Sequence, residues 1–340
     1  MTRVAILNVT GYAGAELARL LHTHPAVELA AVTGRSSVGQ RLPEVFPHLW
    51  PVDLPITDEV DDSVDLVFSA LPHAASAEAV VPFLLRDIPV IDLSADFRLR
   101  DAAVYERFYG RPHPAPELLS GAVYGIPEVT GGPGPDTKLV ANPGCYAAGA
   151  ILALAPAVAS GAIESAVVDG KSGISGAGRS LGQAYHYSEA NDSLSAYGLA
   201  GGGHRHRPEM DQELSRLATD GWSPLTFVPH LVPMTRGILT TAYATPARGV
   251  PASALGDAYR DFYRSSPFVR IVDTPPATKQ VSGTNNCLLH VRSDDPAGRL
   301  IIVSVIDNLG RGAAAQAVHN MNRVLGLPET TGLDAVALYP

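Results

Sequence analysis

The sequence predicts an α/β protein in which a Rossmann-type domain is followed by an α+β domain with a large mixed sheet. Over roughly the first 140 residues, short β-branched runs alternate with helical stretches, which implies a parallel sheet with right-handed crossovers. A glycine-containing turn joins the first strand to the first helix. Beyond residue 145 the strand-like runs become longer, as expected of a mixed sheet.

The expected elements follow from these patterns in chain order. In the first domain we expect strands at residues 4–7, 27–33, 65–71, 89–93 and 138–141, and helices at 13–23 and 74–85. In the second we expect a helix at 146–159, strands at 166–169, 225–229, 238–244, 287–291 and 300–306, and a closing helix at 313–324. Residues 1–145, completed by the C-terminal helix 312–340, would bind the dinucleotide. Residues 146–311 would form the catalytic and oligomerisation domain.

Composition excludes several classes of protein. Lys and Arg number 25 against 34 Asp and Glu, so the net charge of −9 argues against nucleic-acid and anionic-membrane partners. Two cysteines are too few for a disulfide framework, and without a CxxC pair we expect no metal site. The N-terminus lacks a signal-peptide core, and the longest apolar stretch, 147–159, is shorter than the ~20 residues that span a bilayer. We therefore expect a cytoplasmic protein that does not enter a membrane.

The turn after the first strand predicts a pyrophosphate site. Glycines there let backbone N–H groups approach an anion at a positive helix end. Asn8 stands where the pattern G-x-x-G-x-x-G has its first glycine, and Asn tolerates left-handed backbone angles better than most residues. An ordinary β–α turn is the alternative. The expected cofactor-binding residues of this turn are Thr10, Gly11, Tyr12, Ala13 and Gly14.

The end of the second strand favours NADP over NAD. An NAD site would have Asp or Glu here for the ribose diol, whereas this chain has Arg35, Ser36 and Ser37. A guanidinium with two hydroxyls suits a 2′-phosphate through charge-assisted hydrogen bonds. The alternative is a solvated surface arginine.

Cys145 is the candidate nucleophile. It follows Asn142, Pro143 and Gly144 and begins a predicted helix, whose N-terminus stabilises a thiolate and can hold an oxyanion. The alternative is a small buried hydrophobic residue, and that is the interpretation we give Cys287.

A second glycine-rich segment, 171–179, is expected as a loop after a strand, where it would shape a site beside the thiol. Lys171 and Ser172 resemble part of a P-loop, but position 165 is Ser where the required earlier glycine would stand. A nucleotide triphosphatase is therefore disfavoured.

The segment 204–209 offers an acid/base group. His204 and His206 are two residues apart, and no third metal ligand has a recognisable spacing. One of these histidines acting as the partner of Cys145, oriented by Glu209, is the more economical hypothesis, although a structural role for either is equally compatible with the sequence.

These residues together resemble the N-acetyl-γ-glutamyl-phosphate reductase family of arginine biosynthesis, over essentially the whole chain. The matching segments are TGYAGAEL (10–17), ALPH (70–73), DLSADFRL (92–99), YGIPE (124–128), NPGCY (142–146), HRHRPE (204–209), PHLVPMTRG (229–237) and DNLGRGAA (307–314). Two departures are Asn8 for a glycine and Ala148 where the family often has Thr.

The resemblance implies an NADPH-dependent reduction of an acyl phosphate to a semialdehyde through a thioacyl cysteine, in a homodimer or homotetramer. It implies a nucleophilic Cys145, an acid/base His204 with Glu209 nearby, and Arg98 for the anionic groups of the substrate. The further residues that it places at the substrate or the cofactor are Ser172, Gly173, Leu71, Pro72 and Asn308, the last by the nicotinamide.

Three alternatives stay open. A related reductase could act on carrier-linked aminoadipyl phosphate or on aspartyl phosphate. A non-catalytic NADP-binding regulator would bind the cofactor without oxidising a semialdehyde. A cysteine hydrolase would turn over with no cofactor.

Overall fold

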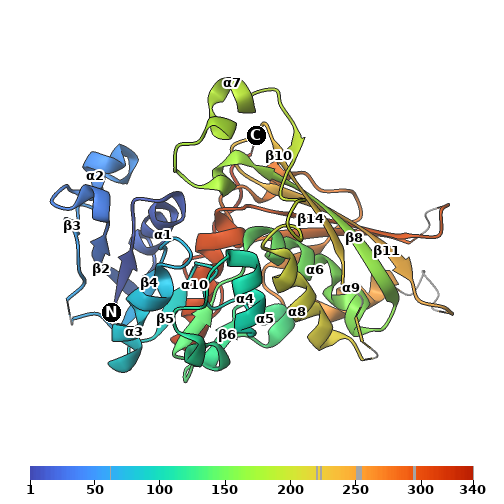
Figure 1. The fold of residues 1–340 in the computed structure, drawn as a ribbon, viewed down its shortest axis with the longest axis horizontal. Coiled ribbons are helices and arrows are strands. Elements are labelled where there is room, and N and C mark those ends of the chain that lie inside the picture. The colour runs from blue at the N-terminus through green and yellow to red at the C-terminus, as the bar shows by residue number, and fades with distance from the viewer. Residues whose placement is uncertain (62, 220, 223, 250–254, 294–295, 340) are drawn as a thin grey trace. The chain divides into compact units, whose positions relative to one another are not determined.

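The computed structural model describes residues 1–61, 63–219, 221–222, 224–249, 255–293 and 296–339 (Figure 1). The chain divides into two compact units. Unit 1 contains Met1–Pro143 and Ala313–Ala335, and unit 2 contains Gly144–Gly312 and the residues from Val336 onward. The sequence predicts that all of 312–340 belongs to the first domain. The last residues instead belong to unit 2, where the Leu338 N–H donates a hydrogen bond to the Ser282 carbonyl at 3.3 Å.

Unit 1 is built on a seven-stranded sheet in the order β3-β2-β1-β4-β5-β7-β6, in which every pair of neighbours is parallel. Its strands are β1 (Thr2–Leu7), β2 (Val27–Thr33), β3 (Ile56–Thr57), β4 (Leu66–Ser69), β5 (Val90–Asp92), β6 (Ala122–Tyr124) and β7 (Leu139–Ala141). Its α-helices are α1 (Tyr12–His22), α2 (Leu42–Val45), α3 (Ser76–Leu85), α4 (Ala102–Tyr109), α5 (Pro127–Thr130) and α10 (Ala315–Val324). A ligand of such a sheet binds at the carboxyl ends of the strands, where the strand order reverses between β1 and β4.

Unit 2 contains a mixed seven-stranded sheet in the order β12-β13-β14-β11-β8-β10-β9. Its strands are β8 (Ile163–Gly173), β9 (Ser195–Ala196), β10 (Thr226–Val232), β11 (Ile238–Pro246), β12 (Val269–Ile271), β13 (Cys287–Arg292) and β14 (Leu300–Ile306). Its α-helices are α6 (Cys145–Ala159), α7 (Tyr187–Ala190), α8 (Arg207–Leu217) and α9 (Leu255–Phe262). The fold class predicted from the sequence, a parallel sheet followed by a mixed sheet, is confirmed.

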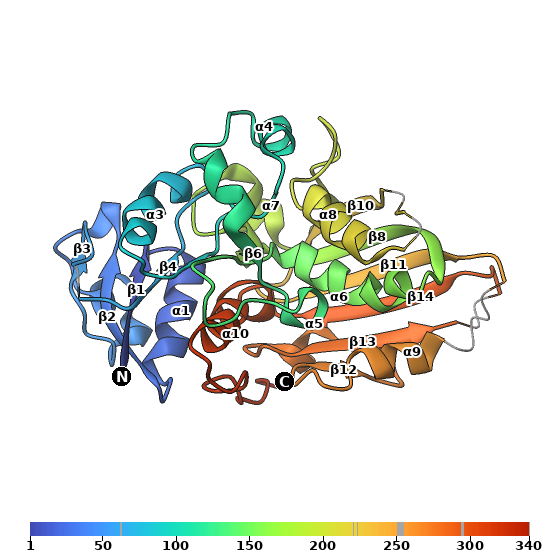
Figure 2. The same ribbon diagram turned by 90° about the horizontal axis from the view of Figure 1, so that it is seen from below.

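Helix α6 is the core of unit 2. It packs against β8, β11 and β14, and α8 and α9 contact it (Figure 2). All of its residues except the first and the last are buried, which explains why its sequence is apolar around its whole circumference. Because α6 is enclosed in this way, its first residue is held in one place.

The segment that we expected as a loop from residue 171 is partly strand, because β8 continues to Gly173. Lys171, Ser172 and Gly173 pair with β10 on one side, and Lys171 and Ser172 also pair with β11 on the other. Glycine is required within this strand, since a Cβ on Gly170 would lie 2.8 Å from a ring carbon of Tyr146. Across the described part of the chain, every helix is too short or too polar to span a lipid bilayer.

Candidate active site

The turn between β1 and α1 has the geometry of an anion-binding loop. Asn8 has a positive φ of 64°, and Gly11 is the N-cap of α1, with nothing within 4 Å of where its Cβ would be. A Cβ on Gly14 would lie 2.6 Å from the Asn8 carbonyl oxygen and 2.7 Å from the Val9 Cα. Gly14 therefore permits the close packing of helix on strand, and Gly11 leaves room for a ligand over the helix N-terminus.

Two further predicted cofactor segments follow the strands on either side of β1. Arg35, Ser36 and Ser37 form a 3-10 turn after β2, in which Arg35 is exposed. Leu71 is half-buried and Pro72 exposed, shortly after β4. Since β2, β1 and β4 are neighbours and parallel, the three segments lie at one edge of the sheet. An open glycine turn, a helix N-terminus and an exposed guanidinium fit a dinucleotide with a 2′-phosphate.

Arg98, predicted to bind substrate, is buried. Its Nε donates to the Asn142 carbonyl at 2.8 Å, and its Nη2 donates to the Leu93 carbonyl at 2.7 Å. These bonds hold the ends of β5 and β7 together, so Arg98 has a structural role in unit 1 in addition to any contact with an anion.

Two buried carboxylates, Asp92 and Asp96, were missed by the sequence analysis. Burial raises the pKa of Asp92 to about 6, while hydrogen bonds from Ser76 and Ser94 oppose that shift. The Asp96 carboxylate accepts hydrogen bonds from the backbone N–H of Ala74 at 2.6 Å and from that of Ala77 at 2.9 Å. It also accepts a hydrogen bond from the Tyr105 hydroxyl at 2.9 Å. Two aspartates four residues apart, one at the end of a buried strand and one shortly after it, were the signal in the sequence. Asp96 fixes the turn that leads from Pro72 into α3.

Cys145 is the first residue of α6 and is partly exposed. Gly144 is the N-cap, and its amide donates to Oε2 of Glu209 at 3.0 Å. Glu209 is fully buried in the first turn of α8. This carboxylate, which we expected to orient a histidine, thus holds the turn that presents the thiol. A Cβ on Gly312 would lie only 2.7 Å from the Cys145 Cβ, so Gly312 lets the chain pass beside the thiol.

His204 lies in an aromatic cluster of unit 2. Its ring packs edge-on against Tyr146 at 5.6 Å, Tyr197 at 5.4 Å and Phe227 at 5.6 Å, measured between centroids. Burial, aided by the charge of Arg205, lowers the pKa of His204 to about 4, so the ring is neutral near pH 7.

The hydrogen bonding of His204 also selects a tautomer. Nδ1 accepts the backbone N–H of His206 at 3.1 Å. A neutral ring in that arrangement carries its proton on Nε2. Tyr146, which follows Cys145 in the first turn of α6, contacts His204 directly, so the helix start that presents the thiol packs against the imidazole.

Ser172, Gly173 and Asn308 shape the remainder of the candidate site in unit 2. Ser172 is buried and donates to the Gly173 carbonyl at 3.0 Å. A Cβ on Gly173 would lie 2.8 Å from the Thr235 carbonyl carbon. Asn308 is buried too. Its Oδ1 accepts a hydrogen bond from the Gly237 N–H at 2.7 Å, and its Nδ2 donates one to the Ser175 hydroxyl at 2.9 Å. Asn308 therefore fixes the turn beside Gly173 with one end of its amide and the loop after β8 with the other.

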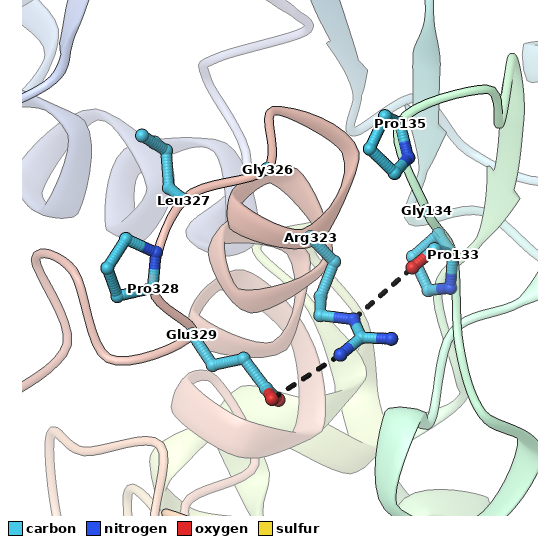
Figure 3. A pocket seen from close by; sticks show the side chains of 8 residues that line it. All are labelled: Pro133, Gly134, Pro135, Arg323, Gly326, Leu327, Pro328 and Glu329. Carbon is cyan, nitrogen blue, oxygen red and sulfur yellow. Dashed lines mark hydrogen bonds and ion pairs between the residues drawn. The ribbon is translucent and has the colours of Figure 1, made fainter.

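A cavity of about 410 Å³ in unit 1 contains none of the predicted site residues (Figure 3). At its wall Arg323 pairs with Glu329 at 3.4 Å and donates to the Pro133 carbonyl at 3.3 Å. Within the described ranges, no group of three or more His, Cys, Asp and Glu side chains is arranged to hold a metal ion.

Two family models match the chain. Residues 3–132 match the model described as "Semialdehyde dehydrogenase, NAD binding domain", and residues 145–308 match "Semialdehyde dehydrogenase, dimerisation domain". A protein of Dehalococcoides mccartyi named N-acetyl-gamma-glutamyl-phosphate reductase is 50% identical over 339 residues, which cover 99% of each chain. This chain belongs to the N-acetyl-γ-glutamyl-phosphate reductase family. A relative of the same name from Pelotomaculum thermopropionicum is 46% identical over 347 residues, again covering 99% of each chain.

Solved structures agree with this fold. Aspartate semialdehyde dehydrogenase II of Vibrio cholerae superposes with a TM-score of 0.73 at 17% identity, covering 96% of this chain and 98% of that one. The aspartate semialdehyde dehydrogenase of Candida albicans, solved with NADP, superposes with a TM-score of 0.67 at 16% identity. The match covers 96% of this chain and 98% of that one. The predictions of the N-acetyl-γ-glutamyl-phosphate reductase family, of an oxidoreductase and of a nicotinamide cofactor are confirmed. The dimerisation domain indicates an oligomer.

Proposed function

We propose that this chain catalyses the NADPH-dependent reductive dephosphorylation of N-acetyl-L-glutamyl 5-phosphate to N-acetyl-L-glutamate 5-semialdehyde, in arginine biosynthesis. The observation that carries the proposal is the partly exposed Cys145 at the N-terminus of α6, with neutral His204 in the adjoining cluster. Half of the residues are shared with a reductase of that name over nearly the full length of both chains, which supports this substrate over aminoadipyl or aspartyl phosphate.

Cys145 performs the first step. Its thiolate, stabilised by the amides and dipole of α6, attacks the carbonyl carbon of the acyl phosphate. A C–S bond forms, the bond between that carbon and the phosphate oxygen breaks, and inorganic phosphate leaves. Glu209 acts through Gly144, since its bond to that amide fixes the turn before the thiol. We place Arg98, Ser172 and Gly173 near the anionic ends of the substrate.

His204 acts in the second half of the reaction as a hydrogen-bond donor to the reacting oxygen. NADPH, when bound, supplies the hydride that reduces the thioester. With its proton on Nε2, neutral His204 donates a hydrogen bond to the oxyanion that hydride addition leaves on the former carbonyl oxygen, and this oxyanion collapses to the aldehyde as the C–S bond breaks. The aldehyde is released and the Cys145 thiolate is regenerated.

Residues of unit 1 would hold the cofactor. The turn of Thr10, Gly11, Tyr12, Ala13 and Gly14 receives the pyrophosphate at the N-terminus of α1. Arg35, with Ser36 and Ser37, receives the 2′-phosphate, and Leu71 and Pro72 lie near a ribose. From unit 2, we place Asn308 by the nicotinamide. On this assignment unit 1, Met1–Pro143 with Ala313–Ala335, forms the NADP-binding domain, and unit 2 forms the catalytic and oligomerisation domain.

We propose a homodimer or homotetramer that uses one face of the unit 2 sheet. The face of β8 opposite its buried residues includes Val167, which is 39% exposed, and its partner on β11 is Tyr243, 37% exposed. Tyr243 in turn pairs with Ile301 of β14, so the row continues across the sheet. A second copy of this chain would cover these side chains. Because the reaction needs a reduced thiol, we place it in the cytoplasm.

The decisive experiment is the reverse reaction, phosphate-dependent reduction of NADP with N-acetylglutamate semialdehyde. We expect turnover that requires both phosphate and NADP, and much slower turnover with aspartate semialdehyde or aminoadipate semialdehyde. A preference for either of those would reassign the substrate. Cofactor binding without turnover would indicate a regulator, and turnover without cofactor would indicate a hydrolase.

A further inference from the structure

Asn8 occupies a position where a side chain is costly. Its φ of 64° lies in the left-handed region, which glycine adopts freely and which other L-residues adopt only at an energetic cost. The glycine pattern of dinucleotide loops has no side chain at this point. The contacts of the Asn8 side chain therefore need an explanation.

Those contacts join the ends of neighbouring strands. Asn8 Nδ2 donates to the Ala70 carbonyl at 3.0 Å, just beyond the end of β4. Asn8 Oδ1 accepts the Thr10 hydroxyl at 3.2 Å, within the glycine turn. On the other side, the Asn8 backbone N–H donates to the Thr33 hydroxyl at 3.1 Å, at the end of β2. One residue thus connects β2, β1 and β4 at the edge where the dinucleotide binds.

We infer that Asn8 is a positioning residue that organises the cofactor loop before the dinucleotide arrives. The inference rests on the proposed function, because Thr10 and the residues after Ala70 are the proposed cofactor contacts. Glycine at position 8 would keep only the bond that its backbone N–H donates to the Thr33 hydroxyl, which would leave the turn and the Ala70 segment to be ordered on binding. A loop that is ordered beforehand binds its ligand more tightly, since less conformational entropy is lost in the complex.

The test is Asn8→Gly in the full-length protein, with NADPH affinity measured by fluorescence titration. Glycine relieves the left-handed strain, so the variant folds while lacking both side-chain bonds. We expect the Kd for NADPH to rise about three- to tenfold, the range for the net loss of a hydrogen bond. We expect kcat at saturating NADPH to change by less than about twofold, because only the binding equilibrium is affected.

Asp87→Gly is the matched control. Asp87 also has a φ of 64° in unit 1, but its side chain pairs with Lys138 at 2.9 Å and is 81% exposed. We expect the control to leave the NADPH Kd unchanged. Hydrogen exchange of the cofactor-free protein supplies a second readout, in which the amides of Thr10 and Gly11 should exchange faster in Asn8→Gly.

The outcomes separate the two hypotheses. If the unaltered protein fails to bind NADPH, the proposed function is wrong and the role of Asn8 falls with it. If the protein binds NADPH but Asn8→Gly keeps the same Kd and exchange rates, the positioning role is wrong and the proposed function is unaffected. A lower melting temperature with an unchanged Kd would likewise overturn the positioning role, because it would show a purely structural contact.

Discussion

Gly312→Ala would displace the nucleophile without altering any group that takes part in the chemistry. The added Cβ would lie 2.7 Å from the Cys145 Cβ and 3.2 Å from its Cα. Carbon atoms prefer a separation of about 3.5–4.0 Å, so the two residues would have to move apart by about 1 Å. Neither the Cβ nor the Cα of Cys145 lies at the far end of a flexible side chain, so the backbone has to shift.

Hydrogen bonds hold both Gly312 and Cys145 in place, so neither residue can move apart without breaking them. Asp307, whose carbonyl accepts the Gly312 N–H at 2.8 Å, is itself held by Arg236 at 3.1 Å and by the Gly283 amide at 2.6 Å. Cys145 is held by the bond between Gly144 and Glu209. A misplacement of about 1 Å at a reacting atom can cost ~10²-fold in rate, so we expect kcat to fall by about one to two orders of magnitude. Overpacking should also reduce the free energy of unfolding by about 1–3 kcal/mol.

The assay is the steady-state rate with saturating NADP, phosphate and N-acetylglutamate semialdehyde, alongside thermal melting. Gly256→Ala in α9 is the control, because its Cβ would make only an ordinary 3.6 Å contact with Arg260. That variant should keep full activity and gain up to about 1 kcal/mol of helix stability. If Gly312→Ala retains kcat within about twofold, the close approach does not position the thiol, and the link between geometry and rate is refuted.

Three further predictions concern single side chains. Arg35→Asp should weaken NADP binding about 10- to 150-fold and favour NAD, because a carboxylate repels the 2′-phosphate; a titration with each cofactor that shows no change would make Arg35 a mere surface residue. His204→Ala should slow turnover by about 10²–10⁴ with NADP affinity intact, and His206→Ala far less; a larger loss at His206 would reverse the assignment. Histidine NMR should find His204 unprotonated down to about pH 4, as its burial requires. Iodoacetamide should label Cys145 first, with loss of all activity, because Cys287 is fully buried against Ser304; peptide mapping that finds Cys287 labelled first would contradict the thioacyl mechanism.

The sequence by itself predicted those features whose causes are local. Alternating β-branched and helical runs predicted the parallel sheet, and β2 and β14 begin and end where the pattern placed them. The turn formed by Asn142, Pro143 and Gly144 predicted that a helix would begin at Cys145, which it does. Strands β3, β6, β9 and β12 were not predicted, because each has only two or three residues and is defined by the strand it pairs with.

Contacts between residues far apart in the chain were decided only by the tertiary structure. Glu209 was expected beside a histidine, but its carboxylate accepts the amide of Gly144, 65 positions earlier. The low pKa of His204 comes from burial among rings that the sequence does not place together. The bond from Asn8 to Ala70 spans 62 positions. Residue type and periodicity report the local backbone preference, whereas burial and hydrogen-bond partners depend on which segments the fold brings into contact.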